Sequence, residues 1–147
     1  MQGVALDWIE PDWPAPAAVR AACTLRSGGV SRGPYTSLNL ADHVGDDPSC
    51  VAQNRALLRD VLDLPGDPLW LRQVHGCDVA MGGGLDQDGC VADASVATGP
   101  GVVCAVLTAD CLPLLLCDRA GTRVAAVHAG WRGLAAGVVE TAVARMQ

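Results

Sequence analysis

The stretch from residue 102 to residue 133, VVCAVLTADCLPLLLCDRAGTRVAAVHAGWRG, most constrains what this chain can fold into. It contains three apolar runs of strand length, at 102–107, 112–117 and 123–127. Continuous apolar runs of this kind are typical of strands buried on both faces of a sheet. Cys111 stands where the first run breaks and His128 where the third ends. Reactive side chains at the ends of rigid elements are candidates for a functional site.

Two helices are predicted around this stretch. The first begins at Pro48, with Asp47 as its N-cap, and stops before Leu64-Pro65-Gly66. The second begins near Gly133 and runs to the last residue, with one apolar stripe formed by Leu134, Val138, Val139, Ala142 and Met146. No residue that terminates helices follows it, so we expect the chain to be the front part of a longer protein.

The other segments are shorter. We expect a strand at 4–9, a Pro-rich turn at 10–16, a strand or helix at 17–25, a long ordered loop at 26–47, a strand at 69–74 and a surface turn at 82–89. The length of 147 residues favours one domain, and strands combined with two amphipathic helices predict an α+β fold. Because phenylalanine is absent, the core is expected to be aliphatic.

Charge and cysteine content exclude several classes of protein. The net charge of −6, without a basic cluster, argues against nucleic-acid or anionic-membrane partners. There is no apolar run of about 18 residues for a membrane span and no recognisable signal peptide, so a cytoplasmic location is expected. The seven cysteines include no C-x-x-C pair and are expected to be free thiols. Cys104 and Cys117 fit the role of small buried hydrophobes.

His75, Cys111 and His128 form the first candidate site. His75 ends the strand predicted at 69–74, and small residues follow both histidines. Two imidazoles and a thiolate suit zinc, with a fourth position left for water or substrate. Two alternatives stay open: each histidine is a structural residue bonded to backbone, or Cys111 is a nucleophile that needs no metal. Asp110 is either a general base or a turn residue, and His43 is expected to be a loop residue.

The segment HAGWRG, residues 128–133, is the second candidate site. Gly130 and Gly133 flank Arg132 at a helix start, where free amides and an arginine can bind an anion. The alternative is a packed turn with Trp131 in the core and Arg132 in solvent. Further arginines that are candidates for anion contacts are Arg55 and Arg72.

Five blocks of the sequence resemble the signature blocks of a known family. They are SRGPYTSLNL (31–40), GDDPSCVAQNR (45–55), LRQVHG (71–76), TADCLPLLL (108–116) and VHAGWRGLAAG (127–137). In this order they resemble the bacterial laccase-domain proteins. That family was once labelled multicopper polyphenol oxidase. Its members are now described as purine nucleoside phosphorylases with adenosine deaminase and methylthioadenosine phosphorylase activities.

The resemblance implies a cysteine-hydrolase-like α+β fold with mixed sheets covered by helices, spanning residues 1–147 but lacking the C-terminal portion of the family. It implies metal ligation by His75, Cys111 and His128, with zinc as the metal and copper as the alternative. Purine nucleosides and phosphate are the implied partners. Asp110 is then a candidate for proton transfer. Candidate substrate contacts are Arg132 and Arg55 for phosphate, and Asn39, Ser37 and Gln73 for the sugar.

Three other functions remain alternatives at this stage. The first is a hydrolase that uses Cys111 and a histidine without metal, and the second is a non-catalytic zinc-binding fragment. The third is the polyphenol oxidase of the older family label. A blue-copper centre needs two histidines and one cysteine, which the chain has. The three histidines of the chain are too few for the additional trinuclear copper cluster of a multicopper oxidase.

Overall fold

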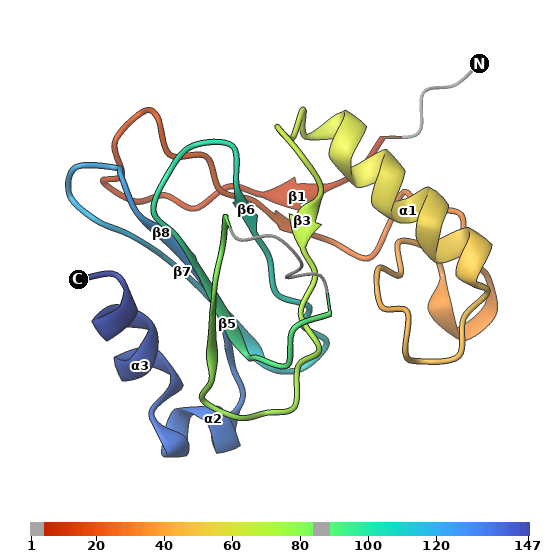
Figure 1. The fold of residues 1–147 in the computed structure, drawn as a ribbon. Coiled ribbons are helices and arrows are strands. Elements are labelled where there is room, and N and C mark those ends of the chain that lie inside the picture. The colour runs from red at the N-terminus through yellow and green to blue at the C-terminus, as the bar shows by residue number, and fades with distance from the viewer. Residues whose placement is uncertain (1–4, 84–88) are drawn as a thin grey trace. The chain divides into compact units, whose positions relative to one another are not determined.

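A computed structural model of the protein describes residues 5–83 and 89–147, and these form two compact units (Figure 1). The first unit combines the described part of Met1–Asp12 with Ala21–Leu64, and the second combines Trp13–Arg20 with the described part of Pro65–Gln147. The strand predicted at 4–9 and the turn predicted at 82–89 lie partly outside the described residues. Together the units contain several small sheets and three α-helices, so the predicted mixed α+β fold is confirmed.

The first unit contains a short hairpin-like pair of strands, a 3-10 turn and one long helix. Strand β1 (Trp8–Ile9) pairs antiparallel with β2 (Cys23–Thr24), which resolves the undecided segment at 17–25 as partly strand. The predicted loop at 26–47 contains only the 3-10 helix η1 (Gly33–Tyr35). Most of this unit therefore depends on contacts between the loop and the helix that follows it.

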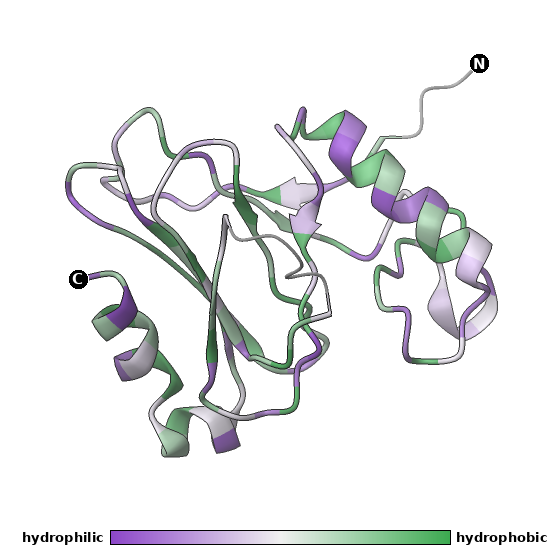
Figure 2. Ribbon diagram, viewed as in Figure 1, coloured by the Kyte–Doolittle hydropathy of each residue, from purple (hydrophilic) through white to green (hydrophobic). Residues whose placement is uncertain are grey.

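Helix α1 (Pro48–Val61) begins where the sequence predicts. The side chain of Asp47 accepts a hydrogen bond of 2.8 Å from the amide of Ser49, and Pro48 takes the first helical position. Val51 and Leu58 are buried, and Figure 2 shows hydrophobic and hydrophilic residues alternating along the helix. The pattern of an amphipathic helix is thus confirmed.

Asn54 is the buried polar residue of α1 and organises the loop at 26–47. Its side chain has no exposed surface. The amide oxygen accepts from the Val30 amide at 2.8 Å, and the amide nitrogen donates to the Ser31 hydroxyl and to the carbonyls of Ser37 and Asn39. These bonds replace the regular ladder that a loop lacks.

The second unit is built on a four-stranded sheet with the order β4-β5-β8-β7. Its strands are β4 (Val79–Met81), β5 (Ala94–Ala97), β7 (Leu112–Cys117) and β8 (Val124–Ala129). Strands β4 and β5 are parallel, whereas β8 runs antiparallel to both β5 and β7. The sheet is therefore mixed, as predicted.

The apolar runs differ in burial because of their places in this sheet. Strand β8 is buried along most of its length, as predicted, because β5 and β7 flank it. Strand β7 is an edge strand and Leu112 at its start is exposed, so the prediction of burial on both faces is wrong there. The central strand β5 was not predicted, since its small residues ASVA give no apolar run. It is nevertheless completely buried.

The strands predicted at 69–74 and 102–107 are much shorter than expected. Only β3 (Pro68–Leu69) and β6 (Val103–Cys104) form, paired in parallel. Beyond β3 the backbone of Trp70 and Arg72 bonds to the segment at 89–92, and the Gln73 side chain bonds to the chain beyond β6. Its amide nitrogen donates to the Leu107 carbonyl at 2.8 Å, and its amide oxygen accepts from the Leu107 backbone N–H at 2.7 Å. These two bonds are those that a backbone amide would make in a strand pair. They hold the chain next to Leu107 just before it turns at His75.

The helix predicted from Gly133 to the last residue is two helices. Helix α2 (Trp131–Ala136) ends at Gly137, whose φ of 91° is left-handed, and α3 (Val138–Arg145) begins after it. Because the chain turns there, Leu134 is exposed while Val138 and Ala142 are completely buried. The single predicted stripe is therefore wrong for its first member.

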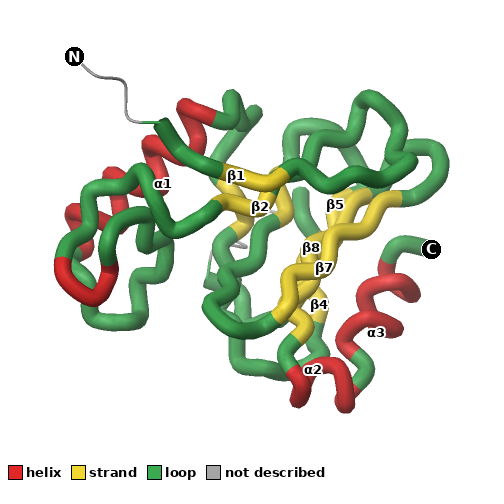
Figure 3. The backbone as a smooth tube through the Cα atoms, turned by 180° about the vertical axis from the view of Figure 1, so that it is seen from behind, coloured by secondary structure: helices red, strands yellow, loops and turns green. Residues whose placement is uncertain are grey.

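Helix α3 packs against β4, β5 and β8, on one face of the sheet (Figure 3). The core between them consists of Ala94, Val127, Val138 and Ala142. It is aliphatic, as expected from the composition. The Arg123 guanidinium donates to the Met146 carbonyl at 2.7 Å, so a distant side chain caps the helix that has no local stop signal.

The remaining expectations concern thiols and membranes. All seven cysteines are free, as predicted, and Cys104 and Cys117 are partly buried. Among residues 5–83 and 89–147, no helix has both the length and the apolar character that a bilayer span requires.

Candidate metal centre

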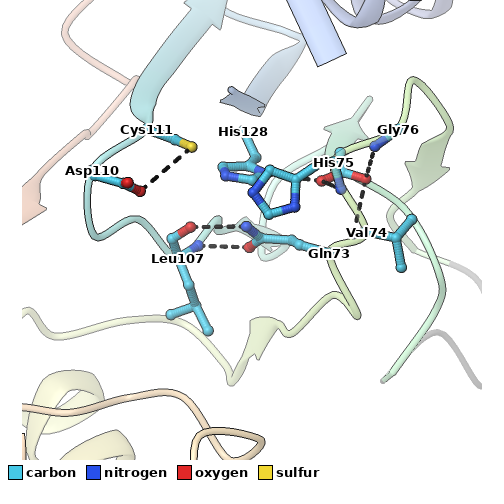
Figure 4. A network of polar contacts seen from close by, with 9 residues as sticks. Gln73, Val74, His75, Gly76, Leu107, Asp110, Cys111 and His128 are labelled. Carbon is cyan, nitrogen blue, oxygen red and sulfur yellow. Dashed lines mark hydrogen bonds and ion pairs between the residues drawn. The ribbon is translucent and has the colours of Figure 1, made fainter. Parts of the chain in front are cut away.

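His75, Cys111 and His128 come together in the second unit. One ligand atom from each lies within 4.8 Å of the others. The two imidazole centroids are 4.7 Å apart and the rings meet nearly edge to face, at 72°. Figure 4 shows both rings and the Cys111 thiol pointing toward one another. The geometry agrees with the juxtaposition that the sequence predicts for these three residues.

The register between β7 and β8 places two of these residues. Leu112 pairs with Ala129 and Pro113 with His128, so Cys111, just before β7, lies opposite Gly130. His128 is the penultimate residue of the buried strand β8 and is itself buried. A two-stranded ladder thus fixes the thiol and one imidazole on the same rigid element.

His75 reaches the cluster from a tight turn and not from a strand. Its φ is 61°, a left-handed conformation that is uncommon for a residue with a side chain. Three successive backbone amides, those of Val74, His75 and Gly76, donate to the carboxylate of Asp93 at 3.1, 2.9 and 2.8 Å. These bonds hold the turn in this unusual conformation and thereby aim the His75 ring.

Asp93 also contacts His128, because its Oδ1 lies 2.8 Å from Nδ1 of the imidazole. Burial acts to raise the pKa of Asp93, but hydrogen bonds from His128 and the three amides outweigh it, so the pKa is lowered. An ionised carboxylate only accepts hydrogen bonds, which makes Nδ1 of His128 the donor. In the neutral imidazole, Nε2 then carries the lone pair that a metal can bind.

The surroundings of Cys111 disfavour a free thiolate. Burial and the neighbouring carboxylate of Asp110 raise the pKa of the Cys111 thiol, whose sulfur lies 3.8 Å from Asp110 Oδ1. A cation beside the sulfur would reverse this effect, since metals bind cysteine as the thiolate. The raised pKa of Cys111 is thus compatible with a metal-bound thiolate.

Gly130 has no side chain, and the side chains of Cys111 and His75 occupy the space next to its Cα atom. A Cβ atom on this residue would lie 3.0 Å from the Cys111 sulfur and 3.2 Å from Cδ2 of His75. A side chain would therefore displace both proposed ligands. Glycine at this position therefore allows the side chains of Cys111 and His75 to approach the backbone closely.

We expect Gly130→Ala to weaken zinc binding about tenfold, the smaller end of the range for changes next to a metal site. The added methyl group must push Cys111 or His75 away from the position in which they would bind the metal. Competition titration with a chromogenic chelator measures this. Gly99→Ala is the control, because nothing lies within 4 Å of a Cβ atom there. Equal zinc affinity in the two variants would contradict the prediction.

The donor set fits a transition metal. Two imidazoles and one thiolate match zinc with an open fourth position, and they also match copper. The ring of His128 bonds to a buried carboxylate, as metal-binding histidines commonly do. The same carboxylate holds His75 through its backbone amide. The residues present therefore fit a metal ion, either zinc or copper.

The HAGWRG segment differs from the alternative of a packed turn in the place of Trp131 and agrees with it in the exposure of Arg132. Trp131 is 73% exposed and lies outside the core. Arg132 is exposed as well, and its guanidinium lies 4.9 Å from the centre of the Trp131 ring. Helix α2 has only six residues, so any anion contact at this place would depend on the arginine side chain.

The other predicted contacts already have partners inside their own units. In the second unit Gln73 is bonded to Leu107, and Asp110 is exposed beside Cys111. The remaining candidates are in the first unit: Ser37 accepts from the Gly29 amide, Asn39 donates to Asp46, and Arg55 donates to the Leu40 carbonyl and pairs with Asp42. His43 is an exposed loop residue, as predicted.

Asp93 is the site residue that the sequence analysis missed. A signal for it exists, because a carboxylate in the small-residue run VADASVA is expected to be buried with a partner. The run is too short and too poor in large apolar residues to predict a strand, and without a strand its carboxylate is not expected at a strand end. The partner, His128, is 35 residues away in the sequence.

Residues 20–147 match the family described as multi-copper polyphenol oxidoreductase laccase. The chain belongs to this family. Proteins named purine nucleoside phosphorylase from Pseudomonas aeruginosa and Escherichia coli are similar to it, with 58% identity over 137 residues and 56% over 135 residues. Each match covers 92% of this chain but only 54% and 56% of the relative, so the chain spans about half the length of these curated relatives.

Solved structures show the same family fold. A Neisseria meningitidis protein is 50% identical with a TM-score of 0.86, over 95% of this chain and 57% of the other. YlmD from Geobacillus stearothermophilus is 33% identical with a TM-score of 0.83, and the match covers 89% of this chain and 52% of the YlmD chain. The resemblance that the sequence blocks indicated is therefore confirmed.

Proposed function

We propose that this laccase-family chain is part of a zinc-dependent purine nucleoside phosphorylase that acts on adenosine, inosine and methylthioadenosine. The observation that carries the proposal is the cluster of His75, Cys111 and His128, whose ligand atoms lie within 4.8 Å of one another. The names of the relatives supply the class of reaction. Adenosine deamination is a second activity that we propose for the same site.

In phosphorolysis a phosphate oxygen forms a bond to C1′ of the ribose as the bond from C1′ to the purine nitrogen breaks. The purine leaves with the bonding electrons and takes up a proton, and ribose 1-phosphate is the other product. His75, Cys111 and His128 would hold the zinc, which supplies a Lewis acid when bound. Asp110, exposed beside Cys111, is our candidate for moving the proton.

Arg132 is our candidate for phosphate binding. Its exposed guanidinium rests on the Trp131 ring at 4.9 Å, which orders the side chain without using its hydrogen-bond donors. A guanidinium with free donors can bind phosphate through two parallel hydrogen bonds. Ser37, Asn39, Arg55 and Gln73 stay as weaker proposals for substrate contacts, since each already bonds to a protein group.

We expect Arg132→Gln to raise the KM for phosphate roughly tenfold, the loss of one charge-assisted contact of about 1.5 kcal/mol. Zinc content should not change, because Arg132 is not part of the metal cluster. Steady-state kinetics with phosphate as the varied substrate measure the effect. Arg119→Gln, which removes another exposed arginine, is the matched control. An unchanged KM in Arg132→Gln would remove this residue from the phosphate site.

The test of the proposed function is release of ribose 1-phosphate from inosine plus phosphate by the full-length zinc-loaded protein. Loss of the reaction in His128→Ala would support catalysis at this cluster. Turnover by metal-free protein would instead favour the cysteine hydrolase alternative. Stoichiometric zinc without any turnover would favour a non-catalytic zinc-binding protein.

A further inference from the structure

Asp93 lies at the centre of the polar network behind the metal cluster. Its side chain is completely buried. Oδ1 faces two donors, the His75 amide at 2.9 Å and Nδ1 of His128 at 2.8 Å. Oδ2 faces two others, the amides of Val74 at 3.1 Å and Gly76 at 2.8 Å. One carboxylate thus organises the backbone of one proposed ligand and the ring of another.

The backbone around Asp93 reinforces this arrangement. The His128 amide donates to the Asp93 carbonyl at 2.7 Å, next to the antiparallel pairing of β5 with β8. The Asp93 amide in turn donates to the Asp78 carbonyl at 3.0 Å. The carboxylate therefore projects from a fixed strand end, and its position does not depend on a flexible loop.

We propose that Asp93 is a positioning residue that determines which nitrogen of His128 is offered to the metal. The Asp93 side chain already accepts three backbone N–H groups, so it also acts as acceptor toward Nδ1 of His128 at 2.8 Å. In the neutral imidazole the proton is then on Nδ1 and the lone pair on Nε2. The same carboxylate holds the turn that aims His75. This inference rests on the proposed metal site but not on the reaction proposed for it.

Asparagine has the same shape as aspartate, and its effect at this position can be derived. In one orientation its NH2 group faces the backbone N–H groups of Val74 and Gly76. All of these groups are donors, so neither contact can be a hydrogen bond. In the other orientation it faces the His75 amide and Nδ1 of His128. Only the imidazole can adapt, by moving its proton to Nε2 and accepting at Nδ1. The second orientation has one unfavourable contact instead of two and is therefore preferred.

The expected result of Asp93→Asn is thus a change of tautomer. Nε2 of His128 becomes protonated and no longer offers a lone pair to the metal. Zinc affinity should fall roughly 10- to 100-fold, as it does when partners of metal-binding histidines are removed elsewhere. A carboxylate with a purely structural role would lower stability without moving the imidazole proton.

The experiment uses the full-length metal-free protein, labelled with nitrogen-15, in mildly alkaline solution. Imidazole nitrogen shifts report the tautomer of His128, and competition titration reports zinc affinity. Asp118→Asn is the matched control, because Asp118 also holds a turn, through the amides of Thr122 and Arg123, but contacts no histidine. The control should keep both the wild-type tautomer and the wild-type zinc affinity.

We expect Nδ1–H in the wild-type protein, and Nε2–H together with at least tenfold weaker zinc binding in Asp93→Asn. Nε2–H in the wild-type protein would overturn the proposal, and this measurement stands even when the variant does not fold. A folded variant that keeps either the wild-type tautomer or the wild-type zinc affinity would also overturn it. Absence of phosphorolysis would change none of these readouts, so the two proposals fail separately.

Discussion

Cys111→Ser is expected to abolish zinc binding at micromolar metal and to abolish phosphorolysis with it. The change removes one of three proposed ligands, so its effect should exceed the roughly 10- to 100-fold loss of affinity that outer partners cause. The serine hydroxyl keeps nearly the same size but is a poor ligand for zinc, which prefers thiolate, imidazole and carboxylate groups. Metal analysis of purified protein and a ribose 1-phosphate assay measure the two losses.

The same chemical change at Cys90 is the control, because this thiol is exposed and lies outside the cluster. Cys90→Ser should bind zinc and turn over as the wild-type protein does. Full zinc content in Cys111→Ser would contradict the assignment of the ligands. If Cys111→Ser kept its zinc but lost activity, Cys111 would be a nucleophile and not a metal ligand.

The largest expected effect on stability is that of Asn54→Ala. The variant removes the four hydrogen bonds of this completely buried side chain, to the Val30 amide, the Ser31 hydroxyl and the carbonyls of Ser37 and Asn39. The Ser31 hydroxyl keeps Asp46 as a partner and the Ser37 carbonyl keeps the Ser31 amide. One unsatisfied buried group costs about 1–3 kcal/mol, and water entering the vacated space will satisfy some of them. We expect the free energy of unfolding to fall by about 3–4 kcal/mol, which is at the upper end for point mutants.

Denaturation by urea, compared with Gln53→Ala, measures this loss. Gln53 precedes Asn54 on the same helix but is exposed, so its truncation should change stability by less than about 0.5 kcal/mol. Similar denaturation midpoints for the two variants would show that the buried amide does not hold the loop at 26–47. Hydrogen exchange of the Val30 amide offers a local readout of the same bond.

Local chemistry in the sequence was sufficient for several elements. The start of α1 follows from Asp47 and Pro48, because a cap and a fixed φ act within a few residues. Strand β7 was predicted with its observed bounds from the run LPLLLC. Candidate ligands were recognisable because only three histidines are present and two of them follow apolar runs.

Other features depend on residues that are distant in the sequence. The strand predicted at 69–74 ends at Leu69, because the backbone of Trp70 and Arg72 bonds instead to the segment at 89–92. The Gln73 side chain then bonds to Leu107, 34 residues away. The final helix breaks where Gly137 adopts a left-handed φ, which glycine permits but does not impose. The burial of β8 and the exposure of Leu112 on β7 follow from the strand order of the sheet.

The sequence by itself determined the family, the α+β class, the first helix and the three residues of the proposed metal cluster. These features are carried by residue identity and by short-range patterns, which the chain contains before it folds. Only the tertiary structure decided how the cluster is oriented. Asp93 forms hydrogen bonds with His128 and with the turn at His75, which belong to separate segments of the chain. Such bonds depend on distance and angle, so they form only when folding has brought these segments together.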